Sequence, residues 1–423
     1  MTVDQDTCGA RPPRSVVVVG ASHAGVQFAD RLRAEGYRGE ITLVSHEPYL
    51  PYQRPPLSKA WLKGAATEES LLLRDPGHYR DQDIELLIGV GVARVERTGD
   101  GVVIRLADGR TRRFDRLVLA TGAAARRPRL PGSEHPDVLV LRELDHAKSL
   151  AGRVAAGPMV VIGGGFIGLE VAATARALGA EVTVVEAGPR LLARAVGEET
   201  ARTLLEAHRA MGTEVLLATV PSEIVHDESG VRGVRLADGR EIPAATVLLG
   251  VGAEPRTELA GQLGLACADG IIVDERCLAS DGWTLAIGDC TVHHSPAGGR
   301  YRLESVDNAV EQANAAAATL LGAPAPERPA PWFWSDQGDQ KLQIVGLMGG
   351  HTAMRLRVDP DRPRRRVALY FAEDTLIAAE CLNSPADFLA LRTAFARGRR
   401  PGPAELSDPG VPLKKLLSAA VPS

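Results

Sequence analysis

An unbroken apolar run, Ser-Val-Val-Val-Val, covers residues 15–19. Apolar residues that do not alternate with polar ones predict a parallel strand covered on both faces. A glycine turn at residues 20–25 and a helix to about Gly36 follow, and a second strand is expected over residues 40–45. This order of strand, glycine turn, helix and strand predicts a βαβ unit.

The same order returns over residues 158–188. Two later features recur as well. Residues 104–111 resemble 234–241 as strand pairs around an Asp-Gly turn, and residues 117–123 resemble 247–253 as buried strands that end in glycine. The chain is therefore expected to hold two versions of one dinucleotide-binding plan.

Two segments interrupt this pattern. Residues 48–59 are rich in proline and predict a loop without regular structure, which could line an active site. A proline-rich linker begins near Ala323 and leads to short strand patterns and a final helix pattern, SPADFLALRTAFARG. The predicted fold class is α/β, with two Rossmann-like dinucleotide-binding domains and a small α+β C-terminal domain.

Composition narrows the class of protein. The chain has 423 residues, of which 45% are hydrophobic and 24% charged, so it can bury several cores. Its net charge of -4 gives no reason to expect nucleic acid or a membrane surface as a partner. No apolar run approaches the roughly 20 residues of a membrane span, and the N-terminus lacks the apolar core of a signal peptide. A soluble, cytoplasmic protein is expected.

The cysteines and histidines do not form a recognisable metal or redox pattern. The five cysteines lie far apart, and none forms a CxxC or CxxxxC pair. This spacing argues against a disulfide framework, a zinc site and a redox-active dithiol. His293 and His294 are adjacent, and neighbouring loop residues rarely converge on one ion. No metal site is predicted.

The second glycine turn has the full spacing Gly163-x-Gly165-x-x-Gly168. The first glycine of such a turn bends the chain, the second admits a pyrophosphate and the third lets helix and strand pack. The phosphates then rest on free N–H groups at the helix N-terminus. Glu186 ends the next strand, where a carboxylate accepts hydrogen bonds from a ribose 2′-OH and repels a 2′-phosphate. The site therefore favours NADH over NADPH.

Basic residues leave that preference partly open. Arg190 and Arg194 follow Glu186 and could reach a 2′-phosphate if their loop turned back.

Arg300 and Arg302 flank a later helix start and are candidates for steering an acidic protein partner. Of these two, Arg302 is the one for which we hypothesise a contact with the partner.

The first glycine turn is incomplete, with Gly20, Ser22 and Gly25 at its three positions. Serine is small, and its hydroxyl can itself bond a phosphate. The strand after this turn leads to His46 and Glu47, and either residue could meet an adenosine ribose. A third glycine-ended strand, in the segment LAIGDC, places Asp289 at the carboxyl end of the sheet, where ligands bind in open α/β folds.

These segments together resemble one family, the FAD-dependent NADH:ferredoxin reductases of the putidaredoxin reductase and rhodocoxin reductase type. The resemblance rests on VVVVGASHAGVQ, RPPLSKAWL, LATGA, VVIGGGFIGLEVAATA, AIGDC, RLESVDNAVEQA, PWFWSDQ, KLQIVGL and VPLKKLL. It implies an FAD-binding domain over residues 1–122 and 251–326, an NAD-binding domain over 123–250 and a C-terminal domain over 327–423. It also implies FAD and NADH as cofactors.

The resemblance further implies which residues bind FAD. Ala24 in the first glycine turn would contact the pyrophosphate, and Lys59 would lie near the flavin N5. Val306 would present its N–H to the flavin O2, and Trp334 would lie beside the isoalloxazine at the ferredoxin-facing edge. The full expected FAD set is Gly20, Ser22, Ala24, Gly25, His46, Glu47, Arg54, Lys59, Val92, Thr121, Gly122, Arg142, Asp289, Val306 and Trp334.

On the NADH side, the resemblance implies two catalytic residues, Lys59 and Glu170, which pair with each other. Phe166 stands where the wider superfamily often has tyrosine, and its ring would gate the nicotinamide pocket. The expected NAD set is Gly163, Gly165, Phe166, Ile167, Gly168 and Glu186. The implied activity is hydride transfer from NADH to FAD and one-electron transfer to a [2Fe-2S] ferredoxin, which serves a haem monooxygenase or a ring-hydroxylating oxygenase.

Other classes of flavoprotein are weighed against this one. Residues 45–59 contain no cysteine, which excludes the related enzymes that place a thiol against the flavin. An NADH-dependent reductase of a small-molecule acceptor, of the quinone or monodehydroascorbate type, stays open as the alternative. A redox-sensed interaction protein of the apoptosis-inducing-factor type is the third possibility.

Overall fold

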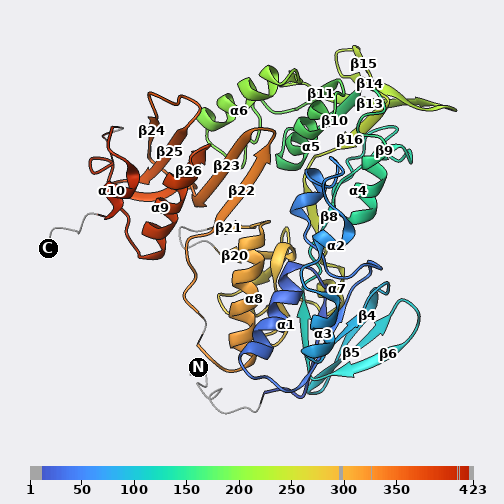
Figure 1. The fold of residues 1–423 in the computed structure, drawn as a ribbon. Coiled ribbons are helices and arrows are strands. Elements are labelled where there is room, and N and C mark those ends of the chain that lie inside the picture. Colours follow the sequence, from blue (N-terminus) through green and yellow to red (C-terminus); the bar gives the residue numbers. More distant parts are fainter. Residues whose placement is uncertain (1–11, 295–298, 325, 407, 409, 419–423) are drawn as a thin grey trace. The chain divides into compact units, whose positions relative to one another are not determined.

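The computed structural model describes residues 12–294, 299–324, 326–406, 408 and 410–418 (Figure 1). Cys8 lies outside the described residues. The chain divides into two compact units, and each collects separate stretches of sequence. Unit 1 contains the residues up to Gln53, Glu68–Ala124 and Glu254–Arg328. Unit 2 contains Arg54–Thr67, Ala125–Ala253 and the residues from Pro329 onward.

A five-stranded parallel sheet forms the centre of unit 1. Its strand order is β19-β7-β1-β2-β3. These strands are β1 (Ser15–Val19), β2 (Glu40–Val44), β3 (Ile84–Leu87), β7 (Arg116–Leu119) and β19 (Leu285–Ala286). The sequence predictions of strands at residues 15–19 and 40–45 are therefore confirmed.

Both faces of this sheet are covered, which explains the unbroken valine run of β1. Val16 and Val18 pack in a core with helices α1 (His23–Ala34) and α8 (Val306–Leu320). Val17 and Val19 pack on the opposite side, in a core that includes β5 (Gly101–Leu106). Because neither face meets water, no polar residue alternates with the valines.

Smaller elements complete unit 1. A three-stranded antiparallel sheet is formed by β4 (Val92–Thr98), β5 and β6 (Thr111–Phe114). A mixed sheet is formed by β18 (Ile271–Val273), β20 (Thr291–His294) and β21 (Arg300–Tyr301), in which β18 and β20 run parallel and β20 and β21 antiparallel. The remaining elements are α2 (Glu68–Leu71), α3 (Pro76–Asp81), α7 (Glu258–Gln262) and the 3-10 turn η2 (Gly288–Cys290). The short strands β8 (Ala123–Ala125) and β17 (Ala253–Pro255) lie where the chain passes from one unit to the other.

Unit 2 contains a second five-stranded parallel sheet, in the order β12-β11-β10-β16-β9. Its strands are β9 (Val138–Leu139), β10 (Met159–Ile162), β11 (Val182–Val185), β12 (Glu214–Leu216) and β16 (Thr246–Leu249). Helices α4 (Leu144–Ala151), α5 (Phe166–Ala177) and α6 (Glu198–Ala210) belong to the same unit. An antiparallel sheet of β13 (Pro221–Asp227), β14 (Gly230–Leu236) and β15 (Glu241–Pro243) matches the one formed by β4–β6. The predicted repeat of one dinucleotide-binding plan is thus confirmed.

The C-terminal part of unit 2 is an antiparallel sheet in the order β22-β23-β26-β25-β24. Its strands are β22 (Trp332–Gln337), β23 (Gln340–Gly346), β24 (Ala353–Val358), β25 (Arg366–Ala372) and β26 (Thr375–Leu382). Helices α9 (Pro385–Ala396) and α10 (Leu413–Ser418) share an apolar core with it. The predicted small α+β domain is confirmed.

The proline-rich segment contains one element that the sequence prediction excluded. Residues Pro55–Ser58 form a 3-10 turn, η1, with proline at its first positions. Proline is tolerated there because its fixed φ suits the turn and the N–H that it lacks would have no partner in the turn. This turn sets the direction in which Lys59 leaves the loop.

Candidate functional site

The first glycine turn joins β1 to α1 in unit 1. Gly20 has a φ of +120°, and a Cβ on it would lie 2.0 Å from the carbonyl oxygen of Ala120. A Cβ on Gly25 would lie 2.0 Å from the carbonyl oxygen of Gly20. Only glycine therefore allows the turn to close against the end of β7. Ser22 stands at the N-cap of α1, and its side chain makes no capping hydrogen bond.

Two other predicted motifs meet this turn at the carboxyl edge of the same sheet. The Thr121 hydroxyl donates to the carbonyl of Arg256 at 2.7 Å, which holds the end of β7 in place. A Cβ on Gly288 would lie 3.1 Å from the Cβ of Ala24, so the Gly-Asp turn that carries Asp289 packs on the start of α1. Segments far apart in sequence thus converge at one edge, as the sequence predicted.

Gln312 fixes the Gly-Asp turn through hydrogen bonds. The sequence did not predict this role. Gln312 lies in α8 and is fully buried. Its Oε1 accepts the N–H of Gly288 at 2.7 Å, and its Nε2 donates to the Thr291 hydroxyl at 2.8 Å. Gln312 belongs to the segment RLESVDNAVEQA, which was recognised in the sequence. A glutamine inside a helix nevertheless gives no local sign that it supports a distant turn.

The remaining predicted FAD residues of unit 1 occupy different settings. His46 is exposed, whereas Glu47 is 7% exposed and accepts a hydrogen bond from the Tyr52 hydroxyl. Val92 is the first residue of β4 and is half-buried. Val306 is the first residue of α8, so the predicted helix start at this position is confirmed.

The second glycine turn, in unit 2, repeats the geometry of the first. Gly163 has a φ of +107°, and a Cβ on it would lie 2.5 Å from the carbonyl oxygen of Gly250 at the end of β16. A Cβ on Gly168 would lie 2.5 Å from the carbonyl oxygen of Gly163. Gly165 is the N-cap of α5 and offers no side chain to its N–H groups. Ile167 follows in the first turn of α5 and is 45% exposed.

Glu186 lies against the second glycine turn. Its Oε2 accepts the N–H of Gly164 and its Oε1 accepts the N–H of Gly188, each at 2.6 Å. These bonds fix the carboxylate next to the turn and leave further lone pairs on both oxygens. The Arg190 guanidinium donates to the carbonyls of Val196 and Ala193, at 2.6 and 2.7 Å. Arg190 is thus engaged within its own loop, which weakens the case for a 2′-phosphate site there.

The two helices that follow the glycine turns are suited to phosphate. Neither α1 nor α5 carries an acidic residue in its first turn or a side-chain cap. By contrast, α4, α6 and α8 each have an acidic residue in the first turn. The free N–H groups and the positive end of the helix dipole therefore favour an anion at α1 and α5. The residues present fit FAD at the first turn and NAD(H) at the second.

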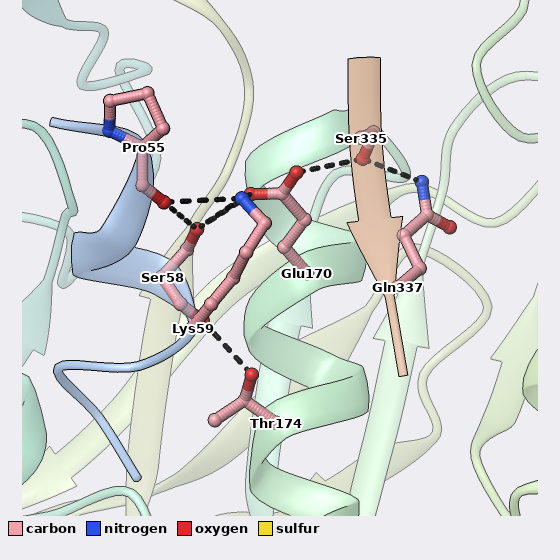
Figure 2. Close-up of polar contacts among 7 residues, drawn as sticks. All are labelled: Pro55, Ser58, Lys59, Glu170, Thr174, Ser335 and Gln337. Carbon is pink, nitrogen blue, oxygen red and sulfur yellow. Dashed lines mark hydrogen bonds and ion pairs between the residues drawn. The ribbon is translucent and has the colours of Figure 1, made fainter. Parts of the chain in front are cut away.

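Lys59 and Glu170 form a buried ion pair in unit 2 (Figure 2). Lys59 follows η1, and Glu170 lies in α5 one helical turn after Phe166. The Lys59 Nζ is 2.6 Å from the Glu170 Oε2, and the side chains are 20% and 4% exposed. The Lys59 Nζ also donates to the carbonyl of Pro55 at 3.1 Å and to the Ser58 hydroxyl at 3.3 Å. The predicted pairing of these two residues is confirmed.

Further hydrogen bonds hold this ion pair. The Ser58 hydroxyl donates to the Glu170 Oε2 at 2.6 Å, and the Ser335 hydroxyl donates to the Oε1 at 2.7 Å. The Thr174 hydroxyl, one turn further along α5, donates to the carbonyl of Ser58 at 2.9 Å. Figure 2 shows the Glu170 carboxylate between Lys59 on one side and Ser335 of β22 on the other. The C-terminal sheet therefore contributes directly to this polar cluster.

Aromatic side chains surround the start of α5. The ring centroids of Phe166 and Phe333 lie 4.5 Å apart, and those of Trp332 and Trp334 lie 5.3 Å apart. Phe166, Phe333 and Trp334 are all half-buried. Phe166 and Trp334 were expected from the sequence, and the structure adds Phe333 as the partner of the Phe166 ring.

Two predicted arginines meet elsewhere in unit 2. Arg54 precedes η1, and Arg142 precedes α4. The Arg54 guanidinium donates to the carbonyl of Arg142 at 2.7 Å. This bond ties the proline-rich loop to the segment before α4.

Arg302, for which a partner contact stays a prediction, lies in an ion pair. The side chain of Arg302 is 13% exposed, and its guanidinium is 2.8 Å from the Glu304 carboxylate. A charge that is buried and neutralised in this way contributes little to steering a partner across solvent. Arg300, two residues earlier, is exposed.

Comparisons with known proteins match nearly the whole chain. Residues 14–313 match the pyridine nucleotide-disulphide oxidoreductase family, and residues 332–417 match the reductase C-terminal domain. The chain belongs to this family. Rhodocoxin reductase of Rhodococcus erythropolis is 40% identical over 406 residues, which are 96% of this chain and 94% of the relative. Putidaredoxin reductase CamA of Pseudomonas putida is 39% identical over 416 residues, covering 96% and 97%.

Solved structures of the family agree with this assignment. The covalent putidaredoxin reductase–putidaredoxin complex matches with a TM-score of 0.91 and 36% identity, and covers 96% of this chain and 98% of that chain. The ferredoxin reductase for the CYP199A2 system of Rhodopseudomonas palustris matches with a TM-score of 0.90 and 41% identity, covering 96% and 100%. The predicted family, its α/β fold and its dependence on FAD and NAD(H) are confirmed. The chain is an oxidoreductase of the ferredoxin reductase type.

Among the described residues, no helix combines the length and the apolar character needed to cross a membrane. This agrees with the sequence, in which no apolar run is long enough for a span.

Proposed function

We propose that this chain passes electrons from NADH through bound FAD to a small [2Fe-2S] ferredoxin, which serves a haem monooxygenase or a ring-hydroxylating oxygenase. The observation that carries the proposal is the match over both the dinucleotide-binding part and the reductase C-terminal domain. The relatives that match over this length include rhodocoxin reductase and the ferredoxin–NAD(+) reductase component of an anthranilate 1,2-dioxygenase system.

We assign the domains as the sequence indicates. Residues 1–122 and 251–326 would bind FAD, residues 123–250 would bind NADH, and residues 327–423 would form the C-terminal domain. The parallel sheet with the incomplete glycine turn lies in the first of these, and the sheet with the complete turn lies in the second. Four strands have the same order in both sheets, β7-β1-β2-β3 in one and β16-β10-β11-β12 in the other, which supports a nucleotide site at each turn.

FAD would rest with its pyrophosphate on the start of α1. Ser22, Ala24 and Gly25, which we assign to FAD together with Gly20, bring no acidic side chain that would repel an anion, and the first N–H groups of α1 would face the phosphates. The N–H of Gly20 donates to the carbonyl of Val44 at 2.8 Å, so this glycine closes the turn. The Asp289 carboxylate lies at the same edge of the sheet, where it would accept hydrogen bonds from the ribityl hydroxyls. The other residues that we assign to FAD are His46, Glu47, Arg54, Lys59, Val92, Thr121, Gly122, Arg142, Val306 and Trp334.

NADH would bind at the second turn, with its pyrophosphate on the start of α5. The Glu186 carboxylate is already fixed by two backbone N–H groups, so its free lone pairs would accept from the adenosine ribose. Its negative charge would repel a 2′-phosphate. The Phe166 ring would cover the nicotinamide pocket. Gly163, Gly165, Ile167 and Gly168 complete the assigned set.

Bound FAD supplies the step between a two-electron donor and a one-electron acceptor. The protein's own contribution is charge and orientation. Lys59 would keep a positive charge near the flavin N5, and Glu170 would hold the lysine in place between steps. Two ferredoxins would be reduced for each NADH, because each [2Fe-2S] cluster takes one electron.

A steady-state assay tests the proposed acceptor. NADH-driven reduction of cytochrome c is measured with purified holoenzyme, with and without an added [2Fe-2S] ferredoxin, and repeated with NADPH. Strong stimulation by ferredoxin, with NADH preferred, is expected. Holoenzyme that NADH reduces but ferredoxin does not reoxidise would overturn the proposal and favour the quinone or monodehydroascorbate alternative.

We also propose that the protein works in the cytoplasm. Among the described residues, Cys267, Cys277, Cys290 and Cys381 are all free thiols. Burial raises the pKa of the Cys277 thiol to about 11, which keeps it protonated and unreactive. Such thiols are typical of a reducing compartment, where NADH is also available.

A further inference from the structure

Strand β22 presents two chemically different faces because its side chains alternate. Phe333, Ser335 and Gln337 point to one side, where Phe333 meets Phe166 and Ser335 meets Glu170 of α5. Trp332, on the other side, packs on Phe388 of α9 with ring centroids 5.7 Å apart. Ser335 and Gln337 are fully buried. Burying two polar side chains on one face of a strand costs free energy unless they are hydrogen-bonded.

A chain of hydrogen bonds leads from Gln337 through Ser335 to Glu170 of the lysine–glutamate pair. The Gln337 Nε2 donates to the Ser335 hydroxyl at 3.2 Å, and that hydroxyl donates to the Glu170 Oε1 at 2.7 Å. Lys59 and Ser58 donate to the other carboxylate oxygen. The Glu170 charge is thus shared among donors on both of its oxygens.

His208 fixes the far end of this chain. It lies in α6, is fully buried, and its Nε2 is 2.9 Å from the Gln337 Oε1. Because the Gln337 Nε2 is used to donate to Ser335, its Oε1 must accept, so the histidine carries its proton on Nε2. The Nδ1 of His208 has no hydrogen-bond partner within the part of the chain that the structure describes. Burial lowers the pKa of His208, which keeps this ring neutral.

We infer that Ser335 and Gln337 are positioning residues for Lys59, with His208 fixing the orientation of the Gln337 amide. Their donors share the charge of the buried Glu170 carboxylate, so that Lys59 is not its sole partner and can present its positive charge to the flavin. This inference rests on the proposed place of Lys59 beside the flavin. It gives the C-terminal domain a part in hydride transfer.

Ser335→Ala tests the first link. Without the hydroxyl, Glu170 relies on Lys59 and Ser58 alone and holds the lysine more tightly. Stopped-flow reduction of the holoenzyme by NADH is expected to slow about five- to tenfold, with the Kd for NADH unchanged within about twofold. Ser335→Thr keeps the hydroxyl and should restore the rate. Thr393→Ala is the control, because it removes an exposed hydroxyl in α9 that donates to the carbonyl of Leu389 in its own helix.

The flavin midpoint potential provides a readout that does not depend on turnover. With Lys59 held closer to Glu170, the Ser335→Ala potential should become more negative. The expected change in the two-electron reduction equilibrium is up to about tenfold, which corresponds to about 30 mV for such a couple. An unchanged potential, or a shift to more positive values, would overturn the inference.

Gln337→Glu tests the second link and covers the case in which Ser335→Ala does not fold. A carboxylate has no N–H to donate to Ser335, and it competes with Glu170 for the Ser335 proton. The same slowing of flavin reduction is expected, together with a rise in the pKa of His208, measured by NMR of its ring proton. A His208 titration and a reduction rate both equal to wild type would contradict the inference.

One further variant separates this inference from the proposed function. Lys59→Met removes the charge itself. If Lys59→Met reduces flavin at the wild-type rate, the proposed role of Lys59 fails. If Lys59→Met is slow while Ser335→Ala and Gln337→Glu are both normal, the role of Lys59 stands and the positioning role of β22 fails.

Discussion

Units 1 and 2 each contain a glycine turn on a five-stranded parallel sheet, and four of the five strands have the same order in both. The acidic residue after the second strand nevertheless has different hydrogen-bond partners in the two units. In unit 2, Glu186 accepts the N–H of Gly164 in the glycine turn itself. In unit 1, Glu47 accepts from Tyr52 and is buried beside it. The comparison shows that the glycine turn follows from the fold, whereas the hydrogen-bond partners of the acidic residue after the second strand are set separately in each unit.

The two units also share a buried contact between a glutamine and a histidine. Each unit contains a fully buried glutamine that touches a buried histidine. Gln312 donates to the Nε2 of His293 at 2.8 Å, whereas Gln337 accepts from the Nε2 of His208 at 2.9 Å. The first glutamine holds the Gly-Asp turn, and the second supports Glu170 through Ser335. Each unit thus pairs a buried glutamine with a buried histidine, but the hydrogen bond runs in opposite directions. The glutamine holds a backbone turn in unit 1 and supports a charged pair in unit 2.

The largest expected effects come from closing the two glycine turns. Gly25→Ala and Gly168→Ala each place a Cβ within 2.5 Å of a backbone oxygen. Each should cost about 1–3 kcal/mol of folding free energy. Gly25→Ala should purify with little FAD, whereas Gly168→Ala should stay yellow and bind NADH at least about tenfold more weakly. The flavin content of the purified variants and the Kd for NADH, obtained by titration, measure these two effects.

Gly261→Ala is the matched control for both variants. Gly261 lies in α7, and a Cβ on it would meet nothing within 4 Å. It should retain both flavin and NADH affinity. Equal loss of flavin in Gly25→Ala and Gly168→Ala would contradict the assignment of one cofactor to each turn.

Removing the charge of Lys59 should have the next largest effect. Lys59→Met should slow NADH-driven flavin reduction about 10²-fold, because one charged group aimed at a reacting centre is commonly worth that much. Lys341→Met removes an exposed lysine of β23 and should leave this step unchanged. Rapid-mixing absorbance of the flavin is the measurement. Equal rates in the two variants would exclude Lys59 from the step.

The two buried histidines should make the protein sensitive to acid. Burial lowers the pKa of His293 to about 4, while an unfolded histidine has a pKa of about 6.5. As pH falls below about 6.5, the unfolded state takes up its proton first, so stability is lost and the loss is complete below about pH 4. Between pH 7 and pH 5 this histidine should account for about 2 kcal/mol.

Urea unfolding at several pH values tests this expectation. His293→Gln removes the titrating group, and its stability should fall less steeply with acid than that of the wild type. His208 is lowered in the same direction by burial, so His208→Gln should flatten the profile as well. A wild-type profile that is flat between pH 7 and pH 5 would contradict the burial of these rings as neutral groups.

The smallest effect is expected at Glu186. Glu186→Gln keeps an oxygen acceptor for one of the two backbone N–H groups but removes the negative charge. NADH affinity should fall about tenfold, or about 1.4 kcal/mol, and discrimination against NADPH should weaken. Kd values for both nucleotides measure this. Unchanged discrimination would mean that another residue, with Arg194 as the first candidate, sets the preference.

Much of the architecture was predictable because its signals are local. The spacing of Gly163, Gly165 and Gly168 and the uninterrupted valines of β1 each report a property of a short segment. The fold class, the repeated dinucleotide-binding plan and the pairing of Lys59 with Glu170 therefore followed from sequence or from family resemblance. The burial of Arg302 beside Glu304 was not predictable in this way, because it depends on how the chain folds around it.

The supporting residues were not predictable for a similar physical reason. Ser335 and Gln337 are ordinary polar residues in a strand, and their role arises only because β22 lies against α5 and α6. The alternation of Phe333, Ser335 and Gln337 was the available signal, since it marks one face of the strand. The η1 turn was also missed, because proline-rich segments usually exclude helical turns but tolerate proline at the first position.

A single-turnover experiment tests the central claim most directly. Holoenzyme is reduced without oxygen by one equivalent of NADH and mixed with an excess of oxidised [2Fe-2S] ferredoxin, and the flavin and cluster spectra are followed together. We expect full reoxidation of the flavin with two ferredoxins reduced per flavin. Flavin that stays reduced in the presence of ferredoxin, but is oxidised rapidly by a quinone, would contradict the account.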